Sequence, residues 1–347
     1  MKQLVLGIET SCDETAAAVV ATGRRVRPSV GASQHELHAE YAGVVPEIAS
    51  RAHAERIVPV VRAALDEAGI AASDLTAIAV GHRPGLIGSL LVGVSAAKGL
   101  AWSLGLPLIG VDHVHAHLHA GCLDRDEPTL PALGLVVSGG HTAIYRVEDW
   151  SKPARLGGTI DDAVGEAFDK AATILCLPHP GGPNLDRLAQ SAEPGEDRAV
   201  DLPISRLAKD SLDFSFSGLK TAVLYAVNGV PTRDGPKPTR TIDDAERRRV
   251  AASFQRAAIE AIILKLGRAH AKHPELRTLV AGGGVTANSL LRARLKAFAR
   301  DRGLTLLLPE LALCIDNAAM IAGLGLHMLE HGITSDLTLT PTPTTAA

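Results

Sequence analysis

Apolar residues in the first third of the chain fall into short runs and into longer segments with a helical repeat. Three apolar runs come first, which is the pattern of consecutive strands. A helix, a strand, a second helix rich in small residues and a further strand follow. The predicted elements are strands at Gln3–Ile8, Ala17–Ala21, 26–32, Leu75–Val80 and Leu108–Val111, and helices at Glu47–Ala68 and Ser89–Leu104. This alternation is typical of an α/β unit, which here ends near residue 125.

The rest of the chain repeats this theme around a glycine turn. Leu133–Tyr145 reads as two strands joined at Ser138-Gly139-Gly140, where an ordinary hairpin and a ligand-binding turn would look alike. Three prolines within six residues predict a loop at Pro178–Pro183. The other predicted elements are strands at Phe214–Gly218 and Leu279–Ala281, and helices at Gly165–Leu175, Asp243–His270, from Gly282–Gly284 to about Arg302, and Asn317–Leu329. Strand-then-turn units after residues 8, 137 and 281 suggest two related lobes around one nucleotide-sized cleft.

Composition and charge narrow the class of protein. The chain has 347 residues, enough for about two domains, with 46% hydrophobic and 21% charged residues and a net charge of −3. That charge argues against nucleic-acid binding over the whole surface, although arginine clusters at 24–27 and 247–256 leave a local basic patch open. Four well-separated cysteines without a C-x-x-C pair indicate reduced thiols. With neither a secretion signal nor an apolar run of membrane-spanning length, we expect a cytoplasmic protein without a membrane segment.

Two histidines are the first candidates for a chemical role. His113 and His117 are four residues apart, so on a helix their imidazoles share one face, as two ligands of one metal do. A third ligand could come from Asp316, which could equally be the N-cap of the helix that follows it. Two histidines and one carboxylate leave coordination positions open and suit Fe²⁺ or Zn²⁺. A zinc peptidase is disfavoured, because Val114 stands where the H-E-x-x-H motif has its glutamate.

Turns at the ends of predicted strands supply further candidates. Gly282–Gly284, followed by Asn288, could receive a phosphate or an adenosine at a helix N-terminus, or could serve only to pack strand against helix. Asp13 follows the first strand, where a carboxylate acts as a base, holds a cation or simply faces water. An acidic run that includes Asp169 suits ribose hydroxyls or a helix N-terminus. Neither a P-loop nor a placed Rossmann glycine motif occurs in the sequence.

Several of these segments belong to one set of motifs spread over residues 4–325. They read GIETSCDET at 7–15, VVPEIASRAH at 44–53, LVVSGGHT at 135–142, IDDAVGEAFDKAA at 160–172, PGGPNLD at 180–186, DFSFSGLKT at 213–221, AGGGVTAN at 281–288 and CIDNAAMIA at 314–322. Each motif is weak alone. In combination they resemble one family, the tRNA threonylcarbamoyltransferases of the TsaD type, whose fold is that of actin, Hsp70 and the sugar kinases.

The resemblance implies a fold and a division of the chain. The fold would be α/β, with two duplicated actin-like lobes of the RNase H-like class around a central cleft. The first lobe would comprise residues 1–125, to which a helix at about 317–333 returns, and the second lobe residues 126–316. Residues 334–347, which include TPTPTT, are expected to form a disordered tail.

The resemblance also implies an activity and a site. The threonylcarbamoyl group of threonylcarbamoyl-AMP would be transferred to N6 of adenosine 37 in tRNAs reading codons that start with adenine, which forms t6A. A divalent metal, Fe²⁺ in first place or Zn²⁺, would be held by His113, His117 and Asp316. Asp13 is our candidate for the proton acceptor. The adenylate would be bound by Val136, Val137, Ser138, Gly139, Gly140, Asp169, Gly182, Asp186 and Asn288.

The resemblance also implies partner proteins, and other functions remain as rivals. Bacterial members of the family act with a paralogue of the same fold (TsaB-like) and a small ATPase (TsaE-like), and the helix Ser89–Leu104 could be a dimerisation face or be buried within its lobe. Two departures stand out: Arg83 replaces the first glycine of a Gly-Pro-Gly loop, and His115 replaces a glutamate and adds a possible competing ligand. The rival functions are an ATP-hydrolysing or phosphotransferase enzyme of the same fold, a metallopeptidase and a non-catalytic scaffold.

Overall fold

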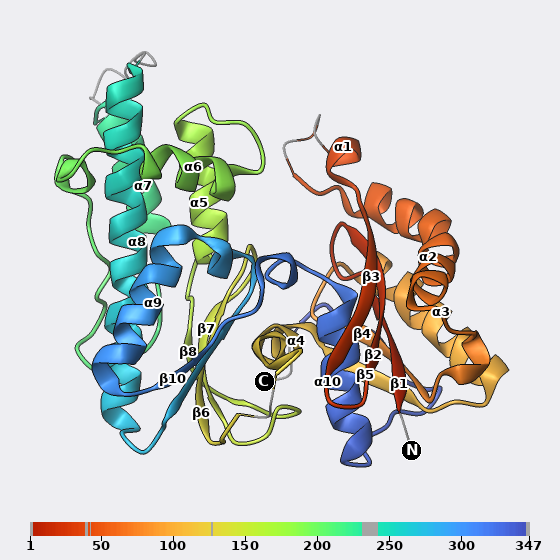
Figure 1. Cartoon of the computed structure of the whole chain (residues 1–347). Coiled ribbons are helices and arrows are strands. Elements are labelled where there is room, and N and C mark those ends of the chain that lie inside the picture. Colours follow the sequence, from red (N-terminus) through yellow and green to blue (C-terminus); the bar gives the residue numbers. More distant parts are fainter. Residues whose placement is uncertain (1–2, 39–40, 42, 126–127, 231–241, 345–347) are drawn as a thin grey trace. The chain divides into compact units, whose positions relative to one another are not determined.

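The computed structural model describes residues 3–38, 41, 43–125, 128–230 and 242–344. The chain divides into two compact units, which are described here one at a time. The first unit comprises residues 1–128, 149–153 and 308–347, and the second comprises residues 129–148 and 154–307. Each unit contains a sheet of five strands (Figure 1).

The two sheets have the same strand order and the same strand directions. The first sheet runs β3-β2-β1-β4-β5 and the second runs β8-β7-β6-β9-β10. In each, the first three strands form an antiparallel meander, and the other two are parallel to its first strand. The strands are β1 Leu4–Glu9, β2 Glu14–Ala21, β3 Arg25–Ser33, β4 Ala77–Arg83, β5 Leu108–Asp112, β6 Ala132–Val137, β7 Thr142–Val147, β8 Ala154–Gly158, β9 Thr278–Gly282 and β10 Thr305–Leu307. The predicted duplicated α/β fold is confirmed.

In the first unit, helices cover both faces of the sheet (Figure 1). The helices are α1 His35–His38, α2 Pro46–Ala68, α3 Ile87–Leu104, α4 His113–His119 and α10 Ala318–Glu330, with short 3₁₀ helices at Ala72–Asp74, Ala120–Cys122 and Leu311–Leu313. Side chains alternate along β1: Leu6 and Ile8 belong to the core formed with α2 and α3, whereas Gly7 faces α10. The sheet is therefore buried on both faces.

In the second unit, one long helix packs against several shorter helices. The helices are α5 Val164–Ile174, α6 Gly181–Gln190, α7 Ser217–Asn228, α8 Asp244–Lys272 and α9 Ser289–Arg302, with short 3₁₀ helices at Glu196–Arg198 and Gly284–Ala287. α8 packs against α5, α6, α7 and α9. Every residue of β6 is buried, so this central strand has no solvent-facing side.

The expected disorder of the C-terminal tail is wrong for residues 334–344. The Ser335 N–H donates to the carbonyl of Leu108 (2.8 Å), and the Thr342 N–H donates to the carbonyl of His82 (3.0 Å). Leu339 packs against the apolar core of the first unit. The physical reason is that β5 is an edge strand, whose open N–H and C=O groups pair with this segment.

Two local predictions in the second unit are also wrong. The loop predicted over Pro178–Pro183 ends early, because α6 begins at Gly181 and Pro183 occupies its first turn, where a helix needs no proline N–H. The strand predicted over Phe214–Gly218 is a single bridge from Phe214 to Thr159, and α7 begins at Ser217. The alternating pattern arises because Phe214 and Phe216 are both buried.

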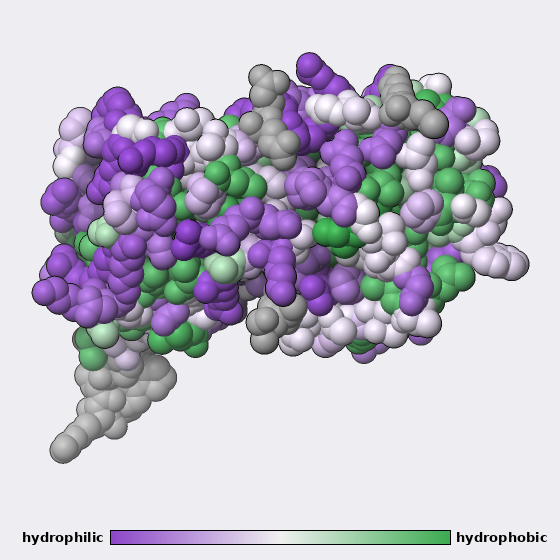
Figure 2. Space-filling view, turned by 90° about the horizontal axis from the view of Figure 1, so that it is seen from below, coloured by the Kyte–Doolittle hydropathy of each residue, from purple (hydrophilic) through white to green (hydrophobic). Residues whose placement is uncertain are grey.

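The helix α3 is long and apolar enough to cross a membrane by length and composition alone. A core helix of a water-soluble protein meets the same criterion, and α3 packs against α2 and β4. On the face in Figure 2, small green apolar patches are separated by purple polar residues. That pattern is common on surfaces that face water.

The contact between β1 and α10 gives the first prediction. A Cβ at Gly7 would lie 2.6 Å from the backbone nitrogen of Ala322 and would collide with the carbonyl oxygen of Ala318. Gly7→Ala should therefore lower the free energy of unfolding by about 1–3 kcal/mol, the usual range for overpacking. Chemical denaturation measures it.

The matched control is Gly99→Ala on the exposed side of α3, where a Cβ meets nothing within 4 Å. This substitution should raise the free energy of unfolding by about 0.5–1 kcal/mol, because alanine loses less backbone entropy in a helix than glycine. A Gly7→Ala protein as stable as the wild type would show that α10 does not lie flush on β1.

Candidate functional site

Helix α4 presents the two predicted histidines, and a buried carboxylate fixes its start. Asp112 is the N-cap: its Oδ1 accepts the N–H groups of Val114 (2.9 Å) and His115 (3.3 Å). Arg83, at the end of β4, donates from Nε to the other carboxylate oxygen of Asp112 (3.1 Å). The arginine in place of glycine at position 83 therefore has a defined partner, which helps to hold the helix that carries His113 and His117.

The other part of the site is the loop before α10. Asn317 caps this helix, because its Oδ1 accepts the N–H of Met320 (2.9 Å), so the alternative interpretation of Asp316 as the N-cap is wrong. The Asn317 amide also donates to the carbonyl of Ile315 (2.7 Å), which ties down the backbone on the other side of Asp316. The Asp316 carboxylate is thereby aimed away from its own helix.

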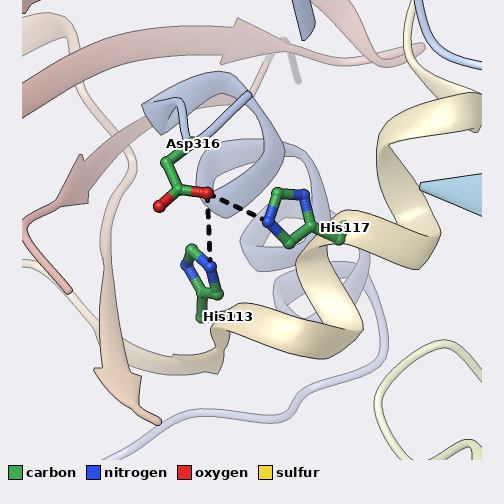
Figure 3. A group of neighbouring side chains, drawn as sticks. All are labelled: His113, His117 and Asp316. Carbon is green, nitrogen blue, oxygen red and sulfur yellow. Dashed lines mark hydrogen bonds and ion pairs between the residues drawn. The ribbon is translucent and has the colours of Figure 1, made fainter. Parts of the chain in front are cut away.

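His113, His117 and Asp316 converge in the first unit (Figure 3). The Nε2 atoms of His117 and His113 lie 3.1 Å and 3.5 Å from Oδ1 of Asp316. One ligand atom from each residue lies within 4.8 Å of the other two. Both histidines are buried, whereas 27% of the Asp316 side chain is exposed, which leaves one side of the group open.

The electrostatics of the two histidines differ. Burial lowers the pKa of His113, but the carboxylates of Glu9 and Asp316 outweigh it and raise this pKa to about 9. Burial lowers the pKa of His117, and the hydrogen bond to Asp316 opposes it only in part. Two imidazole nitrogens and a carboxylate oxygen that point at one place, with an open side, are a donor set that fits a divalent metal ion. Among the described residues His115, the expected competitor, is outside this group.

Asp13 lies in the turn between β1 and β2, and Oγ of Ser11 in the same turn lies 3.2 Å from Nδ1 of His113. Burial raises the pKa of the neighbouring Cys12 thiol, and the negative charges of Asp13 and Asp316 raise it further. His53 of α2 supports the turn: its Nε2 lies 3.0 Å from the Cys12 carbonyl oxygen, and its Nδ1 lies 2.8 Å from Oγ1 of Thr15. The structure thus places the candidate base and the candidate metal ligands in the same unit.

In the second unit, the glycine turn closes a hairpin, as predicted for Leu133–Tyr145. The Ser138 N–H donates to the His141 carbonyl (2.7 Å), and the His141 N–H donates to Oγ of Ser138 (3.1 Å). Val136 and Val137 are buried at the end of β6, whereas Gly139 and Gly140 are exposed. A Cβ at either glycine would meet nothing within 4 Å, so a ligand can approach this backbone closely.

Two further candidates, Asp169 and Gly182, contact each other. Oδ1 of Asp169 on α5 accepts the Gly182 N–H at the start of α6 (3.0 Å). Burial raises the pKa of Asp169, although hydrogen bonds from the backbone of Gly182 and Gly181 oppose this. α5 begins beside the glycine turn, since the Gly165 N–H donates to the Ser138 carbonyl (3.2 Å). These candidates therefore lie at one edge of the sheet.

Asp186 and Asn288 meet at the start of α9. The Asp186 carboxylate accepts the N–H (3.0 Å) and the hydroxyl (2.7 Å) of Ser289. Oδ1 of Asn288 caps the helix by accepting the Leu291 N–H (3.0 Å), and its amide donates to the buried Gln255 (2.8 Å). Since β6 and β9 are parallel, this helix start and the glycine turn lie at the same sheet edge.

Gly283 has a packing role. Its φ is +96°, and a Cβ there would run into the carbonyl of Val137. By contrast, a Cβ at Gly284 or Gly182 would meet nothing within 4 Å. Gly283 is therefore needed for close packing against the end of β6, while Gly284 leaves room for a ligand.

Sequence reasoning missed three residues of the site. Glu9 is fully buried beside His113, Asp112 caps α4, and His53 holds the turn of Asp13. A signal for Glu9 existed in the sequence, because a carboxylate stands at the end of an otherwise apolar strand. Asp112 also carried a local signal, because an aspartate directly before a helix is a typical N-cap. His53 carried none, since its partner Cys12 is distant in sequence.

The duplicated sheets and the His-His-Asp group define the class of protein, an actin- and sugar-kinase-like α/β protein with a candidate metal centre in its first unit. Solved structures share this fold: full-length HypF in the phosphate- and nucleotide-bound form (TM-score 0.59, 15% identity, 96% of this chain and 47% of that one) and component A of the Acidaminococcus fermentans (R)-2-hydroxyglutaryl-CoA dehydratase (TM-score 0.53, 13% identity, 94% of this chain and 97% of that one). At these identities the likeness shows the fold alone.

Comparison of sequences gives the family. The family described as TsaD, tRNA N6-adenosine threonylcarbamoyltransferase, matches residues 25–323. Relatives with that name are 49% identical in Pelobacter propionicus (98% of this chain, 96% of the relative) and 50% identical in Trichlorobacter lovleyi (98% and 96%). The chain therefore belongs to the TsaD family, and the family resemblance expected from the motifs is confirmed.

The convergence of three ligand atoms predicts that His117→Ala and Asp316→Ala each abolish stoichiometric Zn²⁺ binding. Removing one of three protein ligands leaves too few donors for tight binding. Zinc content after gel filtration, measured on protein with an unchanged circular dichroism spectrum, gives the result.

The matched control is Asp66→Ala, which removes an exposed carboxylate from α2 in the same unit. It should leave zinc content at the wild-type level. Full zinc occupancy in the Asp316→Ala protein would show that these three side chains do not form a metal site.

Proposed function

We propose that this protein transfers the threonylcarbamoyl group of threonylcarbamoyl-AMP to N6 of adenosine 37 in tRNAs that read codons starting with adenine, forming t6A. The observation that carries the proposal is membership of the TsaD family, with relatives of that name matched over 98% of the chain at 49–50% identity. The His-His-Asp group of the first unit and the open glycine turn of the second unit are consistent with it. Transfer of a group to tRNA also fits a cytoplasmic protein.

The reaction needs a base and a means of stabilising charge. The N6 amine forms a bond to the carbamoyl carbon, the bond from that carbon to the AMP oxygen breaks, and the amine proton passes to a base. Asp13 is our candidate for that base, because Ser11 of the same turn contacts His113 of the proposed metal site. A divalent ion held by His113, His117 and Asp316, Fe²⁺ in first place or Zn²⁺, would polarise or orient the carbamoyl group.

The adenylate would bind to the second unit. Exposed N–H groups at Gly139 and Gly140 suit an anionic or polar acceptor. Asp186 and Asn288 already accept N–H groups at the start of α9, so their side chains fix the position of this helix start beside the adenylate. Asp169 holds the backbone of Gly182 in a similar way. Val136, Val137 and Ser138 supply the strand end from which the turn projects.

Two rival functions are less well supported. A phosphotransferase or an ATP-hydrolysing enzyme would share the fold, but neither explains the His-His-Asp group or the family match. A metallopeptidase needs a base beside its histidines, and Val114 occupies that position. A non-catalytic scaffold would bind its partner but would modify no tRNA.

We further propose a TsaB-like partner of the same fold and a TsaE-like ATPase, because a chain of net charge −3 has little general attraction for tRNA. The partner surface is the outer side of α3, where Leu91 and Trp102 are exposed together with the small residues Ser95 and Gly99. Other small residues of α3, Gly93 and Ala97, are buried within the unit. The proposed partner surface therefore includes only some of the small residues of this helix.

The open space at Gly182 yields a prediction on ligand binding. Gly182→Val adds a side chain where no protein atom lies within 4 Å but where the adenylate would bind. We expect affinity for a non-hydrolysable threonylcarbamoyl-adenylate analogue to fall at least about tenfold, which corresponds to about 1.4 kcal/mol. Isothermal titration measures it.

Gly218→Val is the control, because Gly218 is likewise the second residue of a helix, is exposed and has nothing within 4 Å. It should bind the analogue as the wild type does. Unchanged affinity in a folded Gly182→Val protein would remove α6 from the ligand site.

The activity itself predicts that labelled threonylcarbamoyl appears in unmodified tRNA when threonylcarbamoyl-AMP and both partners are present, at a fixed salt concentration. Without the partners, modification should be much slower, because tRNA binding draws on several phosphate contacts. Multiple-turnover modification by the isolated chain would contradict the need for partners. No modification with all components present would contradict the function and favour the scaffold.

A further inference from the structure

Glu9 is a carboxylate in the interior of the first unit. It is the last residue of β1, and its exposed fraction is 0%. An ionised carboxylate costs several kcal/mol to bury unless charges or hydrogen bonds compensate it. Its partners therefore indicate why the chain keeps a charge there.

Each oxygen of Glu9 has its own partner. Oε1 accepts the Ser11 backbone N–H (2.5 Å), and Oε2 lies 3.0 Å from Nδ1 of His113. Oγ of Ser11 lies 3.2 Å from the same nitrogen. Gly81 on β4 makes room for this carboxylate, since a Cβ there would lie 2.9 Å from Oε2. The fold thus builds a fitted site for one carboxylate against one edge of the His113 ring.

This arrangement decides which nitrogen of His113 carries a proton. A carboxylate only accepts hydrogen bonds, so Nδ1 must carry the hydrogen that faces Oε2. In a neutral imidazole the other nitrogen, Nε2, then has its lone pair free. That nitrogen is the one 3.5 Å from Asp316.

We infer that Glu9 is a positioning residue for the metal centre: it keeps the proton on Nδ1 of His113 and so presents Nε2 as a ligand atom. The inference rests on the metal site of the proposed function. Carboxylates that accept from the far nitrogen of a metal-bound histidine orient the ring and strengthen its donor atom. His117 differs, because its buried Nδ1 has no hydrogen-bond partner among the described residues. Glu9 therefore acts on one of the two histidine ligands.

The test is Glu9→Gln, which keeps the shape of the side chain and removes its negative charge. The Ser11 backbone N–H can only donate, so it selects the amide oxygen of the glutamine. The amide NH₂ must then face Nδ1 of His113, which becomes an acceptor and leaves the ring proton on Nε2. The variant thus has a donor where the metal needs a lone pair. We expect its dissociation constant for Zn²⁺, measured by competition with a chromophoric chelator, to rise about 10–100-fold.

Side-chain ¹⁵N NMR of protein labelled at histidine gives a second readout. In the zinc-loaded wild type, His113 should carry its proton on Nδ1 and bind zinc through Nε2. In apo Glu9→Gln protein, neutral His113 should carry its proton on Nε2. A role for Glu9 in stability alone would move neither the zinc affinity of the folded protein nor this tautomer.

Glu67→Gln is the matched control, because Glu67 is exposed on α2 of the same unit and undergoes the same chemical change. If the wild type binds no zinc, the proposed metal site fails; if wild type and Glu9→Gln bind zinc equally well, only the positioning role fails. If the Glu9→Gln protein does not fold, the ¹⁵N spectrum of the zinc-loaded wild type tests the inference by itself. Zinc bound to Nδ1 of His113 in that spectrum would overturn it.

Discussion

The close contact of α10 with the first sheet is the constraint on which the candidate metal centre depends. Gly7 on β1 and Gly325 on α10 remove side chains where the two elements meet: a Cβ at Gly325 would lie 2.5 Å from Cβ of Ala79. The helix therefore lies directly on β1 and β4. Asp316 immediately precedes this helix, so the same contact sets the position of its carboxylate relative to His113 and His117.

The duplicated fold is used differently in its two units. In each sheet, the first strand ends in a turn at the same edge as its parallel neighbour. In the first unit that edge carries carboxylates, with the buried Glu9 next to His113 of the candidate metal site and the partly buried Asp13 in the turn. In the second unit it carries the exposed glycines Gly139 and Gly140 and two helix starts, where Asp169, Asp186 and Asn288 accept backbone N–H groups. The first unit thus suits a cation, and the exposed glycine turn of the second unit suits an anionic or polar group of a ligand.

Local signals in the sequence predicted much of the fold. Apolar periodicity located α2, which ends at Gly69 with φ of 66°, and the spacing of His113 and His117 correctly predicted one shared helix face. The residues alone made Asp316 one possible third ligand, and only the family resemblance chose between that role and an N-cap, because nothing in 199 residues of separation indicates contact.

Most of the failures have one physical cause, which is that tertiary partners are not visible in a linear pattern; the early start of α6 is a local exception, since Pro183 lies in its first turn. Residues 334–344 have the composition of a tail, yet an edge strand pairs with them. Phe214 and Phe216 alternate like strand residues, yet the carboxylate of Asp161 ties this segment into a loop by accepting the Phe216 N–H (2.8 Å). Arg83 departs from the glycine of the family's loop, and its hydrogen-bond partner Asp112 lies 29 residues further along the chain.

The central claim is that one divalent ion is bound by side chains from α4 and from the start of α10. An anomalous difference map from a crystal of the protein purified without added metal, recorded on both sides of the iron and zinc absorption edges, tests it most directly. The account predicts one strong peak within about 2.0–2.2 Å of Nε2 of His113, Nε2 of His117 and a carboxylate oxygen of Asp316. A map of a metal-loaded crystal with the peak elsewhere, or with His113 ligating through Nδ1, would contradict it.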